Sequence, residues 1–180
     1  MTRRAQLSKG SRDRAHMDYR VCEIEDERPK RRIADAVLRD LPDWFGIEEA
    51  IVEYVQHSQV MRFWAALVVD DPVGFLALHR HNVYTSEIYC MGVRREFHRH
   101  GIGAKMMAAC EVACRADGTE FLIVKTLDES RSDDSYARTR QFYNAMGFRP
   151  LEVFPRLWGE ANPCVLMAKY LTNDPSASVP

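Results

Sequence analysis

The chain has 180 residues, of which 46% are hydrophobic. This length suits one sizeable core and is short for two. The 25 basic and 26 acidic residues nearly cancel, so no overall charge favours nucleic acid, a membrane surface or a strongly charged partner. Because no run approaches the roughly 18 apolar residues of a membrane span, and the five cysteines include no C-x-x-C pair, we expect a cytoplasmic protein without membrane or nucleic-acid partners.

The two ends differ in composition from the rest. Residues 1–17 carry five basic side chains and one acidic side chain without an apolar stretch, which predicts a disordered basic arm rather than a secretory signal. Residues 172–180 form a Pro/Ser tail with no reason to order. A single domain is therefore expected over residues 18–171.

In the first half of the domain, short segments show the spacing of apolar residues that is typical of strands or helices. Apolar and polar residues alternate over residues 19–25, which predicts a half-exposed strand. Ile33, Val37 and Leu41 recur every four residues, which predicts a helix over residues 28–41. A second helix begins near Ile47. Three β-rich runs follow, and the sequence predicts antiparallel strands at residues 61–69, 73–80 and 83–93, with Asp70, Asp71 and Pro72 forming the first turn.

The second half begins with the clearest helix, at residues 101–117, whose apolar stripe contains Ile102, Met106 and Cys110. A buried strand is predicted at 120–126. The remaining predicted elements are a helix at 136–146 and strands at 148–154 and 164–170. Because a helix connects the strands at 83–93 and 120–126, these two strands should be parallel. The predicted fold class is α/β (α+β): a mixed, mostly antiparallel sheet flanked by helices.

The run from Met91 to Met107, MGVRREFHRHGIGAKMM, places two glycines at the start of the clearest helix. A helix N-terminus presents unpaired N–H groups and a partial positive charge, so a glycine-rich turn there can bind a phosphate with its backbone. The alternative is that Gly101 and Gly103 only make a sharp turn. A third glycine in G-x-G-x-x-G spacing is missing, as is a G-K-[ST] sequence.

The segment HRHGIGA, after a strand that ends in MGV, together with FYNAMGF about forty residues later, resembles the GNAT superfamily of N-acetyltransferases. The resemblance covers roughly residues 19–171. It implies a six- or seven-stranded mixed sheet with about four helices, and acetyl-CoA as cosubstrate.

The resemblance also implies which residues bind the coenzyme. Gly101 and Gly103 match the glycines of the family's [QR]-x-x-G-x-[GA] pyrophosphate loop, whereas His98 replaces its first residue. The backbone of Val93 matches the pantetheine-binding position. Tyr136 replaces an asparagine that often binds the coenzyme. The coenzyme-binding residues predicted in this way are Met91, Val93, Arg94, His98, Arg99, His100, Gly101, Ile102, Gly103, Ala104 and Tyr136, with a solvated basic turn as the alternative role of the arginines.

Acyl transfer from a thioester to an amine needs a proton donor for the departing thiolate. Tyr143 matches the tyrosine of the family's FY-x-x-x-GF segment, and a phenol with a pKa near 10 stays protonated at neutral pH. The alternative is that Tyr143 only packs in an amphipathic helix.

The predicted general base is Glu87, six residues before Val93 and therefore on the same face of an unbroken strand. The alternatives are an exposed strand glutamate, or His79 or His81 as the base. As H-x-H these histidines also suggest a metal site, but no third ligand with suitable spacing accompanies them, so we predict no metal.

Between the first two strands, the family resemblance places a wall of the acceptor site at residues 41–54, LPDWFGIEEAIVEY. Trp44, Phe45 and Glu48 are the predicted substrate-binding residues, because acids and aromatic rings suit a cationic amine. The alternative is a solvated acidic helix face. Trp158 and Glu160 could join the same mouth or form a homodimer contact.

The leading hypothesis is an acetyl-CoA-dependent N-acetyltransferase acting on the primary amine of a small molecule. One alternative is a non-catalytic acyl-CoA sensor on the same fold, which the replaced [QR] and asparagine positions leave open and the retained Tyr143 argues against. The other is an N-acetyltransferase whose acceptor is a protein or peptide.

Overall fold

The computed structural model describes residues 17–171, so the arm predicted at residues 1–17, except for its last residue, and the tail predicted at residues 172–180 lie outside the described part. The elements in chain order are β1 (Arg20–Glu23), α1 (Glu27–Arg39), α2 (Glu48–Ser58), β2 (Arg62–Val68), β3 (Asp71–Arg80), β4 (Thr85–Val93), the 3₁₀ turn η1 (Arg95–Phe97), α3 (Ile102–Ala116), β5 (Phe121–Leu127), α4 (Asp134–Ala145), β6 (Arg149–Phe154) and β7 (Cys164–Tyr170). Each predicted helix and strand is confirmed. No helix within residues 17–171 is long and apolar enough to cross a bilayer.

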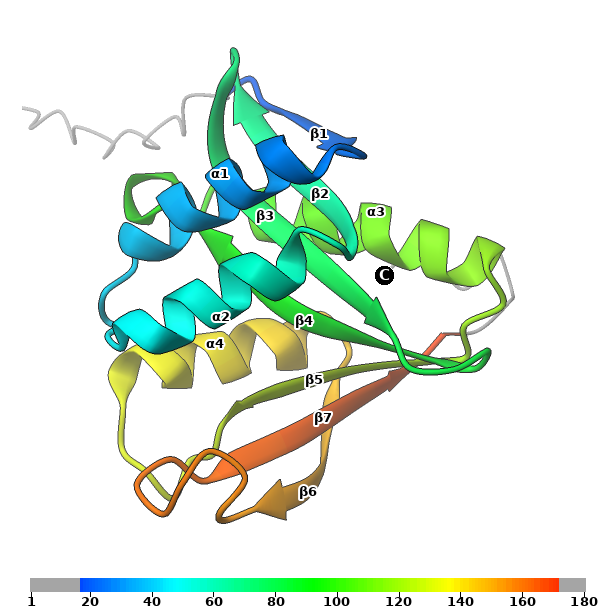
Figure 1. Ribbon diagram of the computed structural model, residues 1–180. Helices are drawn as coiled ribbons and strands as arrows, with labels where there is room; N and C mark the ends of the chain where they lie inside the picture. The colour runs from blue at the N-terminus through cyan, green and yellow to red at the C-terminus, as the bar shows by residue number, and fades with distance from the viewer. Residues whose placement is uncertain (1–16, 172–180) are drawn as a thin grey trace, which may run out of the picture.

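The strands form one seven-stranded sheet in the order β1-β2-β3-β4-β5-β7-β6 (Figure 1). Within the described residues β4 and β5 pair parallel, and the other neighbouring strands pair antiparallel. The predicted mixed sheet with its parallel pair is therefore confirmed. The position of β7 between β5 and β6 does not follow from chain order.

The helices cover the sheet from both sides. On one face α1 and α2 bury Ile33, Val37 and Ile51 against β2, β3 and β4. On the other face α3 buries Ile102, Met106 and the rest of its predicted stripe, and α4 adds the ring of Tyr143. Each face thus has its own apolar cluster, with the sheet as the shared floor.

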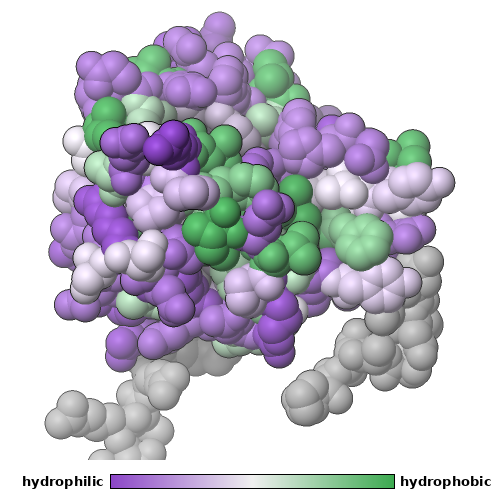
Figure 2. All heavy atoms as spheres, turned by 90° about the horizontal axis from the view of Figure 1, so that it is seen from below, coloured by the Kyte–Doolittle hydropathy of each residue, from purple (hydrophilic) through white to green (hydrophobic). Residues whose placement is uncertain are grey.

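β6 is an edge strand, and most of its side chains are exposed. Leu151 and Leu157 are 68% and 52% exposed. Seen from the β6 end of the molecule, apolar residues gather in the middle of the surface with hydrophilic residues around them (Figure 2). The homodimer suggested by the sequence stays a prediction.

The β2–β3 turn differs from the prediction. The turn consists of Val69 and Asp70, with Val69 in the left-handed region at φ 57°, whereas Asp71 and Pro72 already belong to β3. Pro72 pairs with Leu67, beside a register shift in the ladder. A proline without an N–H group is tolerated at such an irregularity, so it does not end the strand.

A bulge in β4 decides which side chains share a face. Ala77 pairs with Cys90 and Leu78 pairs with Ile88, so Tyr89 is an extra residue in β4. One inserted residue reverses the alternation of faces along the strand. The predicted common face of Glu87 and Val93 is therefore wrong, because the two residues lie on opposite sides of the bulge.

The parallel pairing of β4 with β5 is short. Thr85 pairs with Phe121 at one end and Ile88 pairs with Val124 at the other. Beyond this second pair the two strands are no longer bonded to each other. β4 continues to Val93 along β3, and β5 continues along β7. The sheet thus splits between β4 and β5, next to the bulge.

Candidate active site

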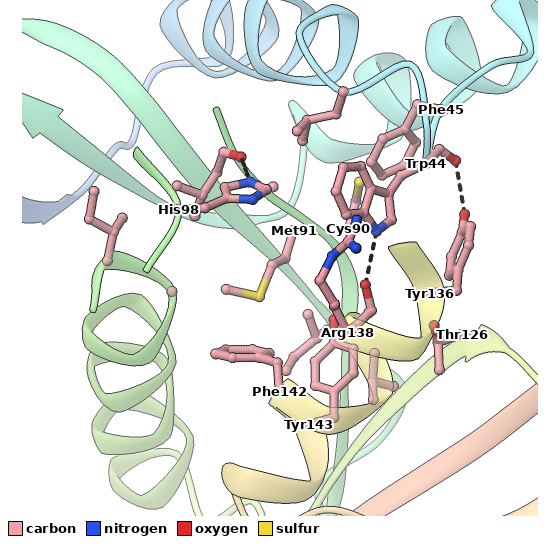
Figure 3. Close-up of a pocket in the computed structure, with 18 of the residues that line it drawn as sticks. Trp44, Phe45, Cys90, Met91, His98, Thr126, Tyr136, Arg138, Phe142 and Tyr143 are labelled. Carbon is pink, nitrogen blue, oxygen red and sulfur yellow. Dashed lines mark hydrogen bonds between the residues drawn. The ribbon is translucent and has the colours of Figure 1, made fainter. Parts of the chain in front are cut away.

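A cleft of about 930 Å³ opens at this split. Its walls come from the α1–α2 connection, the N-terminus of α3, α4 and the unpaired end of β4 (Figure 3). Because its lining includes residues of both apolar clusters, the cleft connects the two faces of the sheet. The predicted site residues that line it are Trp44, Phe45, Met91, Val93, His98, Arg99, Gly101, Ile102, Gly103, Ala104, Tyr136 and Tyr143.

The loop before α3 has the backbone of an anion site. Arg99 and Gly101 both have left-handed conformations, at φ 66° and 80°. Gly101 is the N-cap of α3, no side chain caps the helix, and its first turn contains no acidic residue. The first N–H groups of α3 thus remain open to a negatively charged ligand. At Gly103 a Cβ atom would lie 3.3 Å from the ring of Phe142, so glycine also keeps α3 close to α4.

Two of the predicted coenzyme-binding residues, Arg94 and His100, do not line the cleft. Arg94 forms ion pairs of 2.8 Å with Asp71 and 2.9 Å with Glu96, and it does not line the cleft; neither does His100. Arg95 lines the cleft while paired with Asp43 at 2.5 Å. The arginine run therefore splits between the surface and the cleft, a difference that residue type alone does not show.

His98 has a specific place at the predicted [QR] position. Its Nε2 atom donates to the carbonyl oxygen of Val93 at 2.6 Å, and its ring meets the edge of Trp44 at a centroid distance of 5.7 Å. His98 thereby ties the end of β4 to the loop that precedes α3.

Tyr143 projects from α4 into the cleft (Figure 3) and is 6% exposed. Phe142 and Phe148 meet its ring edge-on. Burial, and to a smaller extent the neighbouring Cys90 and Tyr136, raises the pKa of Tyr143 well above its ordinary value. The phenol is therefore fully protonated at neutral pH, as a proton donor must be.

Glu87 does not line the cleft but lies behind it. The carboxylate is 7% exposed, and Lys125 Nζ lies 2.8 Å from both of its oxygens. His81 Nε2 contacts Oε2 at 2.6 Å. Lys125 lines both the cleft and the neighbouring depression that contains Glu87, His79 and His81. A chain of polar contacts thus leads from the cleft through Glu87 to the surface. Among residues 17–171, no group of three or more His, Cys, Asp or Glu side chains could hold a metal ion.

The α1–α2 connection is fastened to α4 by two hydrogen bonds. Tyr136 Oη donates to the carbonyl oxygen of Trp44 at 2.8 Å, and Trp44 Nε1 donates to Thr139 Oγ1 at 2.9 Å (Figure 3). The hydroxyl of Tyr136 therefore holds this connection across the cleft. Its predicted role as a coenzyme ligand has no separate support in these contacts.

The predicted substrate residue Glu48 faces away from the cleft. Both of its carboxylate oxygens accept from Arg39, at 2.7 and 2.8 Å. Trp158 lines the cleft, whereas Glu160 pairs loosely with Arg156 outside it. Of the acidic mouth predicted from the sequence, only Asp43 lines the cleft within residues 17–171, whereas the aromatic part is present.

Several lining residues were not predicted from the sequence. They are Tyr89, Cys90, Lys125, Thr126, Arg138 and Thr139, whereas Asp43 and Tyr54, which also line the cleft, belong to the segment 41–54 predicted as a wall of the acceptor site. For Tyr89 and Cys90 the missing signal is the bulge, which carries no mark in the sequence. Lys125 lies in a strand that its apolar sequence predicts to be buried. Because lysines are rarely buried, its presence in that strand could have indicated a functional position.

Comparisons with known proteins agree on one family. The model of the acetyltransferase (GNAT) domain matches residues 59–150, slightly more than half of the chain. No curated protein gives a match. Among solved structures, a GNAT-family protein from Desulfovibrio desulfuricans is 18% identical with a TM-score of 0.70, covering 86% of this chain and 100% of that chain.

Two further structures show the same fold. Ard1 from Thermoplasma volcanium is 16% identical with a TM-score of 0.66, and the aminoglycoside 6'-N-acetyltransferase from Enterococcus faecium is 20% identical with a TM-score of 0.66. Each comparison covers 86% of this chain and 98% of the other. The family match, the mixed sheet split at its parallel pair and the open N-terminus of α3 together show that the chain belongs to the GNAT family of acetyltransferases.

Proposed function

We propose that the protein transfers the acetyl group of acetyl-CoA directly to a primary amine of a small molecule. The observation that carries this proposal is the cleft itself, which connects the two faces of the sheet, with an anion-binding helix N-terminus on one side and aromatic side chains on the other. An acyl donor and an acceptor can thus meet between β4 and β5 while entering from opposite faces.

The coenzyme fits the residues on the α3 side. The first N–H groups of α3 and the nearby Arg99 suit a pyrophosphate. Thr126 lines the cleft with a buried hydroxyl that has no hydrogen-bond partner among the described residues. A ligand inserted between β4 and β5 would offer that hydroxyl a partner, since buried polar groups are rarely left unpaired.

In the proposed reaction the amine nitrogen forms a bond to the thioester carbonyl carbon, and the carbon–sulfur bond then breaks. Tyr143 gives its proton to the departing thiolate, and a proton from solvent then restores the phenol. Lys125 takes the proton released by the amine after passing its own proton to Glu87, and His81 carries the proton onward to solvent. This order follows the contacts of 2.8 and 2.6 Å and leaves atoms and charges balanced.

The hydrogen-bonded Trp44 connection favours a small acceptor over a protein chain, because it spans the cleft from α1–α2 to α4. A sensor would bind the coenzyme equally well without needing Tyr143. These alternatives predict different results in one assay.

The test is thiol release from acetyl-CoA with a panel of small amines and lysine peptides, run with Tyr143→Phe and the control Tyr84→Phe. Tyr84 is 58% exposed and lies outside the cleft. Loss of a positioned proton donor should lower kcat by about 100-fold or more, whereas the control should be unchanged. Tight coenzyme binding without turnover on any amine would favour the sensor, and turnover confined to peptides would favour a protein acceptor.

A further inference from the structure

The acceptor side of the cleft is walled by aromatic rings, which we call the aromatic wall: Phe45, Tyr54 and Tyr89. Phe45 and Tyr54 meet edge-on at a centroid distance of 5.7 Å, and Tyr54 meets Tyr89 in the same way at 5.6 Å. They come from the α1–α2 connection, α2 and the bulge of β4, and all three line the cleft. Trp44 and Trp158 line it as well.

The acidic side chains contribute little free negative charge to the lining of the cleft, and Glu53, which lies near Tyr54 and Tyr89, is outside the lining and 4.0 Å from His57. Asp43 is the only acidic residue of the described chain that lines the cleft, and it is paired with Arg95 at 2.5 Å. Glu48 and Glu87 point elsewhere and have their own partners. The lining also contains Arg99 and Arg138, together with Lys125, whose charge is balanced by Glu87 behind the cleft, so basic side chains outnumber acidic ones along the lining.

The phenols supply no negative charge either. Burial raises the pKa of both Tyr89 and Tyr136 to about 12, and it raises the pKa of Tyr54 further. The hydroxyl of Tyr89 is also occupied by His57 Nδ1 at 2.8 Å. At neutral pH the residues that line the acceptor side therefore offer neutral ring surface, and their one carboxylate, Asp43, is paired with Arg95.

From this arrangement we propose that the acceptor is an arylalkyl monoamine, one primary amine on a short chain that ends in an aromatic ring. The ring packs against the aromatic wall, since aromatic pairs favour offset or edge-on contact. The single amine reaches the split between β4 and β5. A polycation such as a polyamine or an aminoglycoside finds no carboxylate for its additional charges and meets Lys125 and Arg138 instead. The choice of acceptor rests on the proposed transfer reaction, but the binding of such a ligand does not.

Binding is measured first, because it is independent of catalysis. The tryptophans in the cleft, Trp44 and Trp158, report ligand binding by fluorescence. Protein saturated with CoA is titrated with phenethylamine, hexylamine and spermidine. Phenethylamine should bind about tenfold or more tightly than spermidine, and more tightly than hexylamine. Equal or tighter binding of spermidine, or no measurable binding of phenethylamine, would overturn the proposal.

Variants of the wall then test the contact. Phe45→Ala and Tyr54→Leu should each weaken phenethylamine binding about tenfold while leaving acetyl-CoA affinity within about twofold. Tyr84→Ala serves as a control, because this exposed ring lies outside the cleft. Phe45→Glu should shift the ratio of affinities toward spermidine, since it supplies the missing carboxylate. If the ratio does not move, the lining does not select the acceptor.

Turnover separates the two proposals. With acetyl-CoA present, a higher kcat/KM for phenethylamine than for spermidine supports both. Turnover that prefers spermidine or an aminoglycoside contradicts the acceptor class alone. Phenethylamine that binds tightly but is never acetylated contradicts the transferase reaction and leaves the aromatic site standing.

Discussion

The two sides of the cleft are built from different parts of the chain. On the α3 side the groups proposed to bind the coenzyme are backbone N–H groups presented by one short loop, with glycines at the points of close approach. On the acceptor side they are side chains brought together from four segments: the α1–α2 connection, α2, β4 and α4. A backbone site needs only a local conformation, whereas a side-chain site needs the whole fold. This difference separates what a motif can reveal from what packing alone creates.

The largest effect is expected at Glu87, behind the junction of the two sides. Glu87→Gln removes the carboxylate that accepts the proton of Lys125 in the proposed relay, so kcat/KM should fall by about 100-fold or more at neutral pH. It also leaves Lys125 without its anionic partner, at a cost of about 3 kcal/mol in the free energy of unfolding. Steady-state kinetics and urea unfolding measure the two effects.

Glu111→Gln is the matched control for Glu87. Glu111 is also a buried carboxylate with a lysine and an arginine partner, at 2.5 Å from Lys169 and 3.1 Å from Arg115, but it lies on α3 outside the cleft. It should lose comparable stability with kcat unchanged. Equal losses of activity in both variants would assign Glu87 a structural role only.

A smaller effect is expected on the backbone-built side. Gly101→Ala places a Cβ atom on a left-handed residue at the N-terminus of α3 and should weaken acetyl-CoA binding about tenfold while costing about 1 kcal/mol of stability. Gly118→Ala carries the same backbone strain, at φ 75°, after the other end of α3. Calorimetric titration should show weaker coenzyme binding for Gly101→Ala alone. An equal loss in both variants would mean that strain, not the anion site, explains the change.

The free energy of unfolding should fall at alkaline pH because of the buried Tyr143. Burial raises the pKa of Tyr143 above its value of about 10 in an unfolded chain. The native state then holds the phenol proton more tightly than the unfolded chain does. The contribution of Tyr143 to the free energy of unfolding is therefore complete below pH 10, and it falls by about 1.4 kcal/mol per pH unit as the pH rises above 10. Urea unfolding between pH 9 and 11.5 should show a shallower decline for Tyr143→Phe. Parallel curves for the two proteins would contradict the burial of this phenol, and Tyr84→Phe is the exposed control.

The smallest effect is expected where the two sides are tied together. Tyr136→Phe removes the hydrogen bond to the carbonyl oxygen of Trp44, at a cost of about 1 kcal/mol. If Tyr136 acts through this connection, the KM of the amine should rise a few-fold and the KM of acetyl-CoA should stay constant. The opposite pattern would return Tyr136 to the coenzyme role that the family resemblance suggested.

Site residues that lie within short sequence motifs were predicted well, whereas residues whose role depends on distant parts of the chain were not. Gly101, Gly103 and Tyr143 were found because they lie within short motifs, and all three line the cleft. Glu48 and Arg94 were chosen for charge and neighbourhood, yet each is bound to a partner that is unremarkable in the sequence. Glu87 was assigned to the wrong face because the prediction assumed an unbroken strand, and a bulge of one residue reverses the alternation.

The sequence by itself determined the periodic segments, hence the helices, the strands and the parallel pair across α3, because hydrophobic spacing and glycine position act over a few residues. Tertiary structure decided the place of β7 beside β5, the split between β4 and β5 and the aromatic wall of Phe45, Tyr54 and Tyr89. The physical reason is that strand order and the partners of charged side chains are set by packing between segments far apart in the chain, and no local pattern encodes which of them meet.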